Sequence, residues 1–263
     1  MDRADGRFGA PRVHFRVTDS TNARARELAS RGAPDGTVVT AAEQSAGRGR
    51  QGRTWSAPAG RALLCSIVIR EPPALLPLVA GVAVAEVVDG AGAGATAGRG
   101  AVAGRGAVAG RGAMAGQGAV QIKWPNDVLV NGRKVAGILV EGRFQERWAV
   151  VGIGVNVALR AEDFPAELRD RAGTLGLDPS AIEPTLAALL RELERWVDAG
   201  SEPVLEAVRA RDALLGRSVR WGGGAGVGAG IDGDGRLVVR TAGGEVRLDA
   251  GEVHLGDGEP PTL

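Results

Sequence analysis

Three arginines lie close together in a glycine-rich segment, residues 47–53, which reads Gly-Arg-Gly-Arg-Gln-Gly-Arg. The guanidinium groups of Arg48, Arg50 and Arg53 can each pair with a carboxylate or a phosphate through two parallel hydrogen bonds. Successive backbone N–H groups of such a loop also form a concave site for anions. The segment therefore predicts a loop that binds an anionic ligand, and a solvated surface loop is the equal alternative while the segment is taken alone.

The same segment has the spacing G-x-G-x-x-G at Gly47, Gly49 and Gly52, which by itself is a weak signal for dinucleotide binding. That signal requires a helix to open inside the motif, and the downstream Pro58 and Gly60 disfavour a helix. The sequence of a Walker loop is absent as well. The loop is therefore predicted to bind its ligand through its arginines and backbone N–H groups.

Lysine and asparagine are rare in this chain. Lys123 and Lys134 are its only lysines, and two of its four asparagines, Asn126 and Asn131, lie between them. A coding bias toward arginine, alanine and glycine explains the scarcity. Because lysine is a compact charge on a flexible stem and arginine is a planar fork, the surviving lysines predict positions where arginine cannot substitute. Residues 123–134 are therefore predicted to take part in chemistry.

The elements that position these segments follow from hydrophobic periodicity and from turn residues. Asp19–Asn22 offers N-caps for a first helix, and Asn131-Gly132 is a strong hairpin signal. The predicted strands span residues 13–17, 37–42, 62–70, 120–124, 128–130, 133–141 and 148–151, and the predicted helices span residues 23–30, 74–88, 184–199 and 203–215.

The end of the chain changes character. Short β-prone runs at residues 218–221, 237–240 and 245–248 are joined by glycine-rich turns, which predicts a small β-barrel, although the run 222–230 specifies it poorly. We therefore expect an α+β fold with two domains, residues 1–215 and residues 216–263. A six-residue repeat of the type AGRGAV makes residues 91–118 a predicted flexible insertion, because alanine and glycine bury too little surface to order it.

Composition excludes several classes of protein. A net charge of +1 gives no overall attraction to nucleic acid or to an anionic membrane. No secretory signal opens the chain, and its longest apolar stretch, residues 74–88, is too interrupted to span a membrane. The single cysteine, Cys65, forms no intrachain disulfide, and His14 and His254 are too distant in sequence to suggest a protein-held metal site. We expect a cytoplasmic protein without DNA or membrane partners.

Five segments occur in a fixed order along the chain, and together they closely resemble the biotin protein ligase family over about residues 13–255. The arginine-glycine loop and the sequence Lys-Trp-Pro-Asn-Asp are highly specific in combination, whereas the first and last segments are weak by themselves. The five segments are Asp19–Asn22, Glu43–Trp55, Lys123–Asp127, Lys134–Glu141 and Gly152–Asn156.

The resemblance implies a mixed β-sheet with flanking helices, related to class II aminoacyl-tRNA synthetases, followed by an SH3-like barrel. It also implies a biotin–[biotin carboxyl-carrier protein] ligase, which forms biotinyl-5′-AMP from biotin and ATP with Mg²⁺ and transfers biotin to a lysine of a carboxylase carrier domain. Only about a dozen residues precede the first predicted strand. A monofunctional ligase without the DNA-binding domain of some relatives is therefore expected, and a homodimer is left open.

Residue by residue, the resemblance assigns one set to biotin and its reacting carboxylate: Ser20, Thr21, Asn22, Gln44, Arg48, Gly49, Arg50 and Lys134. Arg50 and Lys134 are the predicted catalytic residues, while Arg53, Trp55 and Asn156 are assigned to ATP. Trp55 offers a face for adenine stacking, with core packing as its alternative. A structural ion pair is expected for Lys123 or Asp127.

The tail departs from the family pattern Gly-Glu-(Val/Ile)-x-Leu-Arg, whose arginine can reach the nucleotide. Here Gly256 stands where that arginine would be. Either Arg247 or another group substitutes for it, or ATP is held with less help.

Two other functions stay open at this point. A lipoyl or octanoyl transferase of related fold would need an activated cysteine, and Cys65 lies inside the apolar run Leu63–Ile69, where burial is expected. A lipoate ligase would still adenylate its acid. A nucleic-acid-binding module would use the arginine-glycine loop and the repeat, but the near-neutral charge and an aromatic fraction of 3% oppose it.

Overall fold

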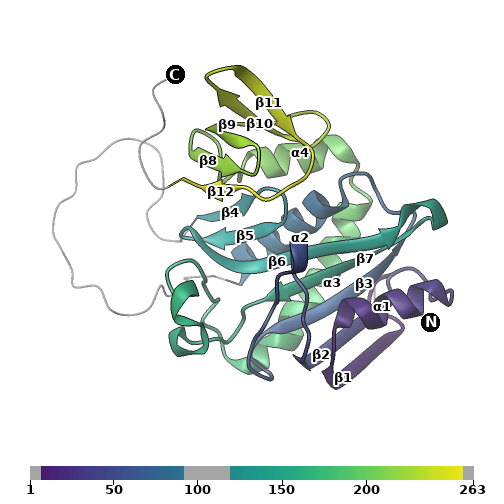
Figure 1. Cartoon of the computed structure of the whole chain (residues 1–263). Helices are drawn as coiled ribbons and strands as arrows, with labels where there is room; N and C mark the ends of the chain where they lie inside the picture. Colours follow the sequence, from purple (N-terminus) through teal and green to yellow (C-terminus); the bar gives the residue numbers. More distant parts are fainter. Residues whose placement is uncertain (1–6, 92–118, 257–263) are drawn as a thin grey trace.

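A seven-stranded sheet forms the centre of the computed structural model, which describes residues 7–91 and 119–256 (Figure 1). The strand order is β1-β2-β3-β7-β6-β5-β4. β1 and β2 are parallel, and the other neighbouring strands are antiparallel. The strands are β1 (Arg12–Thr18), β2 (Val38–Gln44), β3 (Leu63–Arg70), β4 (Val120–Lys123), β5 (Asp127–Val130), β6 (Arg133–Arg143) and β7 (Trp148–Val155).

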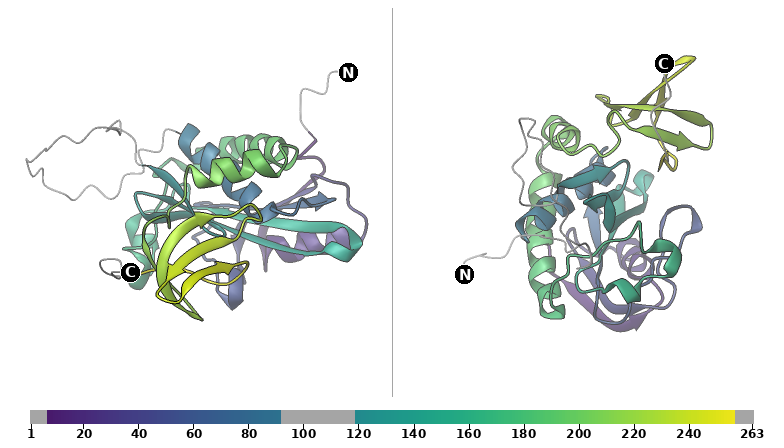
Figure 2. Two further views of the ribbon diagram at one scale, coloured as in Figure 1. Left: turned by 90° about the horizontal axis from the view of Figure 1, so that it is seen from above. Right: turned by 90° about the vertical axis from the view of Figure 1, so that its left-hand side faces the viewer.

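Helices cover both faces of this sheet, as the left view of Figure 2 shows. α2 (Leu76–Gly90) and α3 (Ile182–Val197) pack on one face, and α1 (Thr21–Ser30) packs on the other. β3 is buried between the two layers, so its residues alternate between two hydrophobic clusters: Ile67 joins the α2–α3 core, whereas Val68 packs against α1. The predicted mixed sheet with flanking helices is confirmed.

The hairpin signal at Asn131-Gly132 is also confirmed. Both residues have positive φ, +51° and +74°, and they connect β5 to β6. Such left-handed backbone at both central residues matches the twist of antiparallel strands. The hairpin pairs Asp127, at the start of β5, with Gly137 of β6.

The last part of the described chain forms a second, five-stranded antiparallel sheet in the order β11-β10-β9-β8-β12. Its strands are β8 (Ser218–Trp221), β9 (Gly224–Ile231), β10 (Leu237–Thr241), β11 (Gly244–Leu248) and β12 (His254–Leu255). The glycine-rich run predicted to be poorly specified is therefore mostly strand β9, paired on both sides. Within residues 216–256, β11 and β12 are the sheet edges, and closure into a barrel is not confirmed.

Two predicted boundaries were wrong by more than two residues. β7 continues four residues beyond residue 151, so most of the segment Gly152–Asn156 is strand. α4 (Ser201–Arg209) ends six residues before the predicted Leu215. The chain leaves the helix there because the main chain on either side of Asp212 pairs with Ile122 of β4 (Ile122 N to Arg211 O, 2.7 Å). The predicted flexible insertion, residues 91–118, lies outside the described residues, apart from Ala91. In the described ranges, no helix is long and apolar enough to cross a membrane.

Candidate active site

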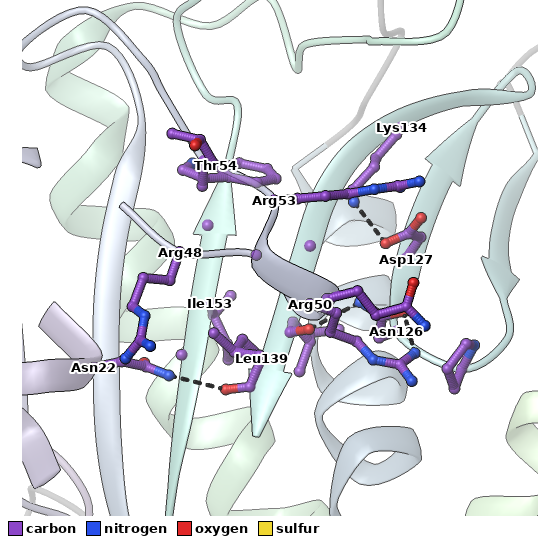
Figure 3. A pocket seen from close by; sticks show the side chains of 18 of the residues that line it. Asn22, Arg48, Arg50, Arg53, Thr54, Asn126, Asp127, Lys134, Leu139 and Ile153 are labelled. Atoms are coloured by element: carbon purple, nitrogen blue, oxygen red, sulfur yellow. Dashed lines mark hydrogen bonds and ion pairs between the residues drawn. The ribbon is translucent and has the colours of Figure 1, made fainter. Parts of the chain in front are cut away.

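A pocket lies on the α1 side of the sheet, where β6 and β7 run beneath the arginine-glycine loop (Figure 3). The loop is a tight hairpin, closed by hydrogen bonds from Gly49 N to Arg53 O (2.6 Å) and from Trp55 N to Gly47 O (2.9 Å). The start of α1, the turn before β5 and residues 251–253 of the C-terminal tail complete the walls. Segments far apart in the sequence thus converge on one cavity.

Glycines form the floor of this pocket. Gly137 of β6 pairs with Gly154 of β7, and Gly152 lies two residues earlier on the same face. A Cβ on Gly154 would lie 2.4 Å from Trp55 Cε2, and a Cβ on Gly152 would lie 2.0 Å from Asn22 Oδ1. Both distances are too short for any other residue. The glycines of the segment Gly152–Asn156 therefore keep room for Trp55 and Asn22 above the sheet.

Trp55 rests on this floor and also packs against a small cluster formed by Ala62, Leu64, Leu159 and Phe164. Lys134 Nζ lies 5.6 Å from the centroid of its ring. Its indole Nε1 is buried without a hydrogen-bond partner in the described residues. The ring of Trp55 is thus partly in a core and partly in the pocket wall, and its stacking on adenine stays a prediction.

A β-bulge turns Lys134 toward the pocket. The register of β5 and β6 shifts between Val128 and Leu129, which leaves Val135 as an extra residue on β6. Val135 and Ala136 are consecutive, yet both are fully buried in the α2–α3 core. If the strand were regular and kept all its residues, strict alternation would place Lys134 on the same core face as Ala136. Hydrogen bonds of its N–H to Arg171 O (2.7 Å) and of its carbonyl to Gly173 N (2.8 Å) fix the bulged backbone.

The cations of the pocket contact oxygen acceptors from other segments of the chain. Lys134 Nζ lies 2.7 Å from Asp127 Oδ1, although the angles there do not make a hydrogen bond. Arg53 contacts Glu252 of the tail. Figure 3 shows two of these contacts, that of Lys134 with Asp127 and that of Arg50 with Asn126. The remaining distances are 3.0 Å for Arg50 Nη1 to Asn126 Oδ1 and 3.5 Å for Arg48 Nη1 to Glu141 Oε1.

The pocket nevertheless keeps an excess of positive charge. Five cationic side chains line it against two carboxylates, those of Asp127 and Glu252. Lys123 is the fifth cation; burial lowers its pKa, and the nearby Asp127 carboxylate at 3.8 Å opposes that shift. Such a surplus in a partly enclosed site attracts anions and is not strongly screened by salt. The predicted structural ion pair involves both Lys123 and Asp127, and Asp127 is shared with Lys134.

A second part of the pocket is polar and uncharged. Ser20, Thr21 and Asn22 at the start of α1 are buried, and Gln44 Oε1 accepts hydrogen bonds from Thr21 N (2.7 Å) and Thr21 Oγ1 (3.0 Å). Ser66 joins them from β3, with its hydroxyl 2.6 Å from Asn22 Oδ1. These side chains offer both donors and acceptors beside the cationic end of the pocket.

Ten of the eleven residues assigned from the family resemblance line this one pocket. Asn156 is the exception: it is buried at the end of β7, and its side-chain amide donates to Gly173 O (2.8 Å), away from the cavity. Arg247 is also elsewhere, on β11 beside Asp232 and Glu245, so it does not substitute for the missing tail arginine.

Sequence reasoning missed four residues that touch the assigned set. Ser66 was detectable, because it is a lone polar side chain inside the apolar run of β3. Asn126 was noted as rare, but its hydrogen bond to Arg50 was not foreseen. Glu141 and Glu252 stand in segments that match the family, but no role was assigned to them, because only the fold shows that these two acids reach the loop.

Comparisons with known proteins identify the family of this chain. A family model described as "Biotin/lipoate A/B protein ligase family" matches residues 14–157, and one described as "Biotin protein ligase C terminal domain" matches residues 214–256. The chain is 35% identical over 261 residues to a biotin--[acetyl-CoA-carboxylase] ligase of Paracoccus denitrificans, covering 91% of this chain and 98% of that protein. It is 34% identical over 257 residues to the enzyme of the same name in Mycobacterium tuberculosis, covering 90% and 86%.

A solved structure shares the fold over nearly the whole chain. The biotin protein ligase from Aquifex aeolicus in complex with biotin and ATP has a TM-score of 0.72 and 25% identity, and the similarity covers 94% of this chain and 100% of that one. Both domain models, the curated relatives and this structure agree with the motif set gathered in the pocket. The chain therefore belongs to the biotin/lipoate A/B protein ligase family and, within it, to the biotin protein ligases.

Proposed function

We propose that this protein is an ATP-dependent ligase that forms biotinyl-5′-AMP and transfers biotin to a lysine of a biotin carboxyl carrier protein. The observation that carries the proposal is the pocket itself, where five cations and an uncharged polar group of side chains meet above a glycine floor. The cations suit the carboxylate of biotin and the phosphates of ATP. The uncharged polar side chains suit the polar ring of biotin, and the glycine floor leaves space for both ligands. Relatives named as ligases of this kind support the same conclusion.

The first step needs charge neutralisation. An oxygen of the biotin carboxylate attacks the α-phosphorus of ATP, the bond to the bridging oxygen breaks, and pyrophosphate leaves with the electron pair. Because both reactants are anions, cations that hold them at reacting distance lower the barrier. We assign this role to Arg50 and Lys134, whose contacts with Asn126 and Asp127 preorganise them.

The remaining residues are assigned by the chemistry that each can offer. The ureido ring of biotin has donors and acceptors, which suits the buried polar set Ser20, Thr21, Asn22 and Gln44, with Arg48 and Gly49 beside it. Arg53 and Trp55 are assigned to the phosphates and the adenine of ATP. Asn156 can contribute to the nucleotide site only if its hydrogen bond to Gly173 opens.

The second step uses the adenylate as an activated acid. The neutral amine nitrogen of the carrier lysine attacks the acyl carbon, the bond from that carbon to the phosphate oxygen breaks, AMP leaves with the electron pair, and the nitrogen of the new amide gives up a proton to solvent. Its leaving phosphate is again an anion, so the same cations stabilise the departing charge.

Magnesium fits this site as a companion of the nucleotide. Mg²⁺ keeps several waters and binds through substrate phosphates with one or two carboxylates. Within the described ranges, no group of three or more His, Cys, Asp or Glu could hold a metal ion. Asp127 Oδ1 is buried in the pocket wall, 2.7 Å from Lys134 Nζ but without a hydrogen bond, so we propose that the Asp127 carboxylate would hold the ion while it keeps its contact with Lys134. The ion would neutralise phosphate charge. A cytoplasmic location, a monofunctional chain and a homodimer stay predictions.

Mass spectrometry of the products tests this function. The protein is mixed with Mg-ATP and equal amounts of biotin, lipoate and octanoate, and the acyl-adenylates are identified. Biotinyl-adenylate alone is the expected result. A lipoyl or octanoyl adenylate would keep the chemistry and change the acid. The absence of any adenylate, with retention of the protein on DNA at low salt, would favour nucleic-acid binding instead.

A further inference from the structure

The C-terminal tail brings a negative charge into a pocket built for anions. Glu252, flanked by Gly251 and Val253, lines the cavity and contacts Arg53 of the arginine-glycine loop. The side chain of Glu252 is only 24% exposed, whereas that of Arg53 is 60% exposed. A partly buried carboxylate at this place opposes the binding of a polyphosphate, so it requires an explanation.

Glu252 contacts one arginine that we assign to ATP and lies beside an imidazole ring. Arg53 is its direct partner, and His254 Nε2 lies 3.4 Å from the same oxygen, Oε1. The charge of Glu252 also reaches Lys123, because it raises the pKa of that amine while Arg53 lowers it, both weaker effects than burial. Glu252 therefore balances positive charge contributed by the loop and by β4.

Glu252 also differs from the acceptors of the other cations. Asn126 is neutral, and Glu141, which contacts Arg48, does not line the pocket. Asp127 lines it but already contacts two lysines, which leaves a net positive group. Glu252 is the lining carboxylate whose direct partner is assigned to ATP.

We infer that Glu252 is a competing anion: it occupies Arg53 in the free protein, and the phosphates of ATP displace it. The tail thus lowers the affinity for nucleotide, and the contact between Glu252 and Arg53 breaks when nucleotide binds. This inference rests on the proposed function, because it takes Arg53 as a phosphate-binding residue. An exposed ion pair has a modest strength, so the competition should cost about two- to fivefold in affinity.

Calorimetric titration of Mg-ATP in the absence of biotin tests the inference without relying on turnover. Glu252→Gln keeps the shape of the side chain and removes its charge; we expect the Kd for Mg-ATP to fall about two- to fivefold. Glu245→Gln is the matched control, since Glu245 belongs to the same small sheet but pairs with Arg247 outside the pocket. The control should leave the Kd unchanged, and biotin should bind all three proteins equally.

A double variant distinguishes competition for Arg53 from a general effect of charge. When Arg53→Gln is already present, Glu252→Gln should no longer tighten Mg-ATP, because no guanidinium remains to be released. An equal gain in both backgrounds would overturn the competition. An unchanged Kd of the single variant Glu252→Gln would also overturn it, because Glu252 would then only attach the tail to the loop. A raised Kd would overturn it as well, because Glu252 would then assist the binding of the nucleotide or of its magnesium.

The proposed function fails in a different way. If the wild-type protein binds Mg-ATP but yields no biotinyl-adenylate with biotin, the ligase proposal falls while the comparison of Kd values still decides the role of Glu252. If the wild-type protein binds no Mg-ATP in this titration and also forms no biotinyl-adenylate with biotin, both proposals are overturned.

Discussion

Replacing Lys134 with alanine should separate catalysis from folding. The substitution removes a cation that we place at the reacting carboxylate, and loss of one preorganised stabilising group typically costs about 100- to 1000-fold in rate. The structural loss is small by comparison. Asp127 keeps Lys123 at 3.8 Å, so its carboxylate is not left alone. The partly exposed pair and the contact with the Trp55 ring together contribute about 1–2 kcal/mol, which corresponds to a few degrees in Tm.

The assay is the rate of biotinyl-adenylate formation under saturating biotin and Mg-ATP, with thermal unfolding measured in parallel. Arg143→Ala is the control, because Arg143 is on the same strand, 68% exposed, and pairs only with nearby Glu146. It should keep wild-type rate and nearly wild-type Tm. A Lys134→Ala protein that forms adenylate at the wild-type rate would refute the reasoning and remove Lys134 from the site. A large fall in Tm would show that its role is mainly structural.

Three further results are expected. Gly154→Ala places a methyl group 2.4 Å from the Trp55 ring, so the ring must move, and the Kd for Mg-ATP should rise about tenfold in calorimetry; an unchanged Kd would remove Trp55 from the nucleotide site. Burial raises the pKa of the Cys65 thiol to about 12, so iodoacetamide at pH 8 should label the protein only in denaturant, and native labelling would contradict that burial. Asp212 has a buried Oδ2 without a partner among the described residues, and burial raises its pKa. Its carboxyl thus resists ionisation in the folded state, and stability falls as pH rises above about 4, where the unfolded chain ionises. The Asp212→Asn variant should therefore unfold at a higher urea concentration than the wild type at pH 7, and this difference should shrink toward about pH 4. If the variant and the wild type have the same unfolding midpoint at pH 7, this account is wrong.

The sequence predicted the order and type of the central elements well, because most of them have a strong local signal. β3 is a continuous apolar run, and Asn131-Gly132 adopts the left-handed turn that its residue types favour. The errors occurred where tertiary contacts override local preference. The predicted continuation of α4 is helical by composition, but its backbone pairs with Ile122 instead. β9 is rich in glycine, yet pairing with β8 and β10 makes it a strand.

The candidate site residues were predicted from residue types and from the family resemblance, and not from local structural signals. The arginine-glycine loop and the scarce lysines and asparagines indicated residues that take part in chemistry. The family resemblance then assigned residues from these segments to ligands. Ten of the eleven assigned residues line one pocket, although residues far apart in the sequence give no indication that they are close in space. What it could not supply is the set of acceptors that meets the cations. Glu141 and Glu252 are 111 residues apart in the sequence, and although both stand in segments that match the family, only the fold shows that they meet the loop.

The bulge at Val135 shows how one backbone irregularity can decide chemistry. A regular strand would direct Lys134 into the α2–α3 core, where an unpaired ammonium is costly. The extra residue lets two consecutive apolar side chains, Val135 and Ala136, fill that core while Lys134 faces the pocket and meets Asp127. The same bulge is held on its outer side by the main chain of residues 171–173, the segment that Asn156 also binds. A change in that segment on nucleotide binding would therefore act on Lys134 and Asn156 together, which connects the two residues that the resemblance assigns to different substrates.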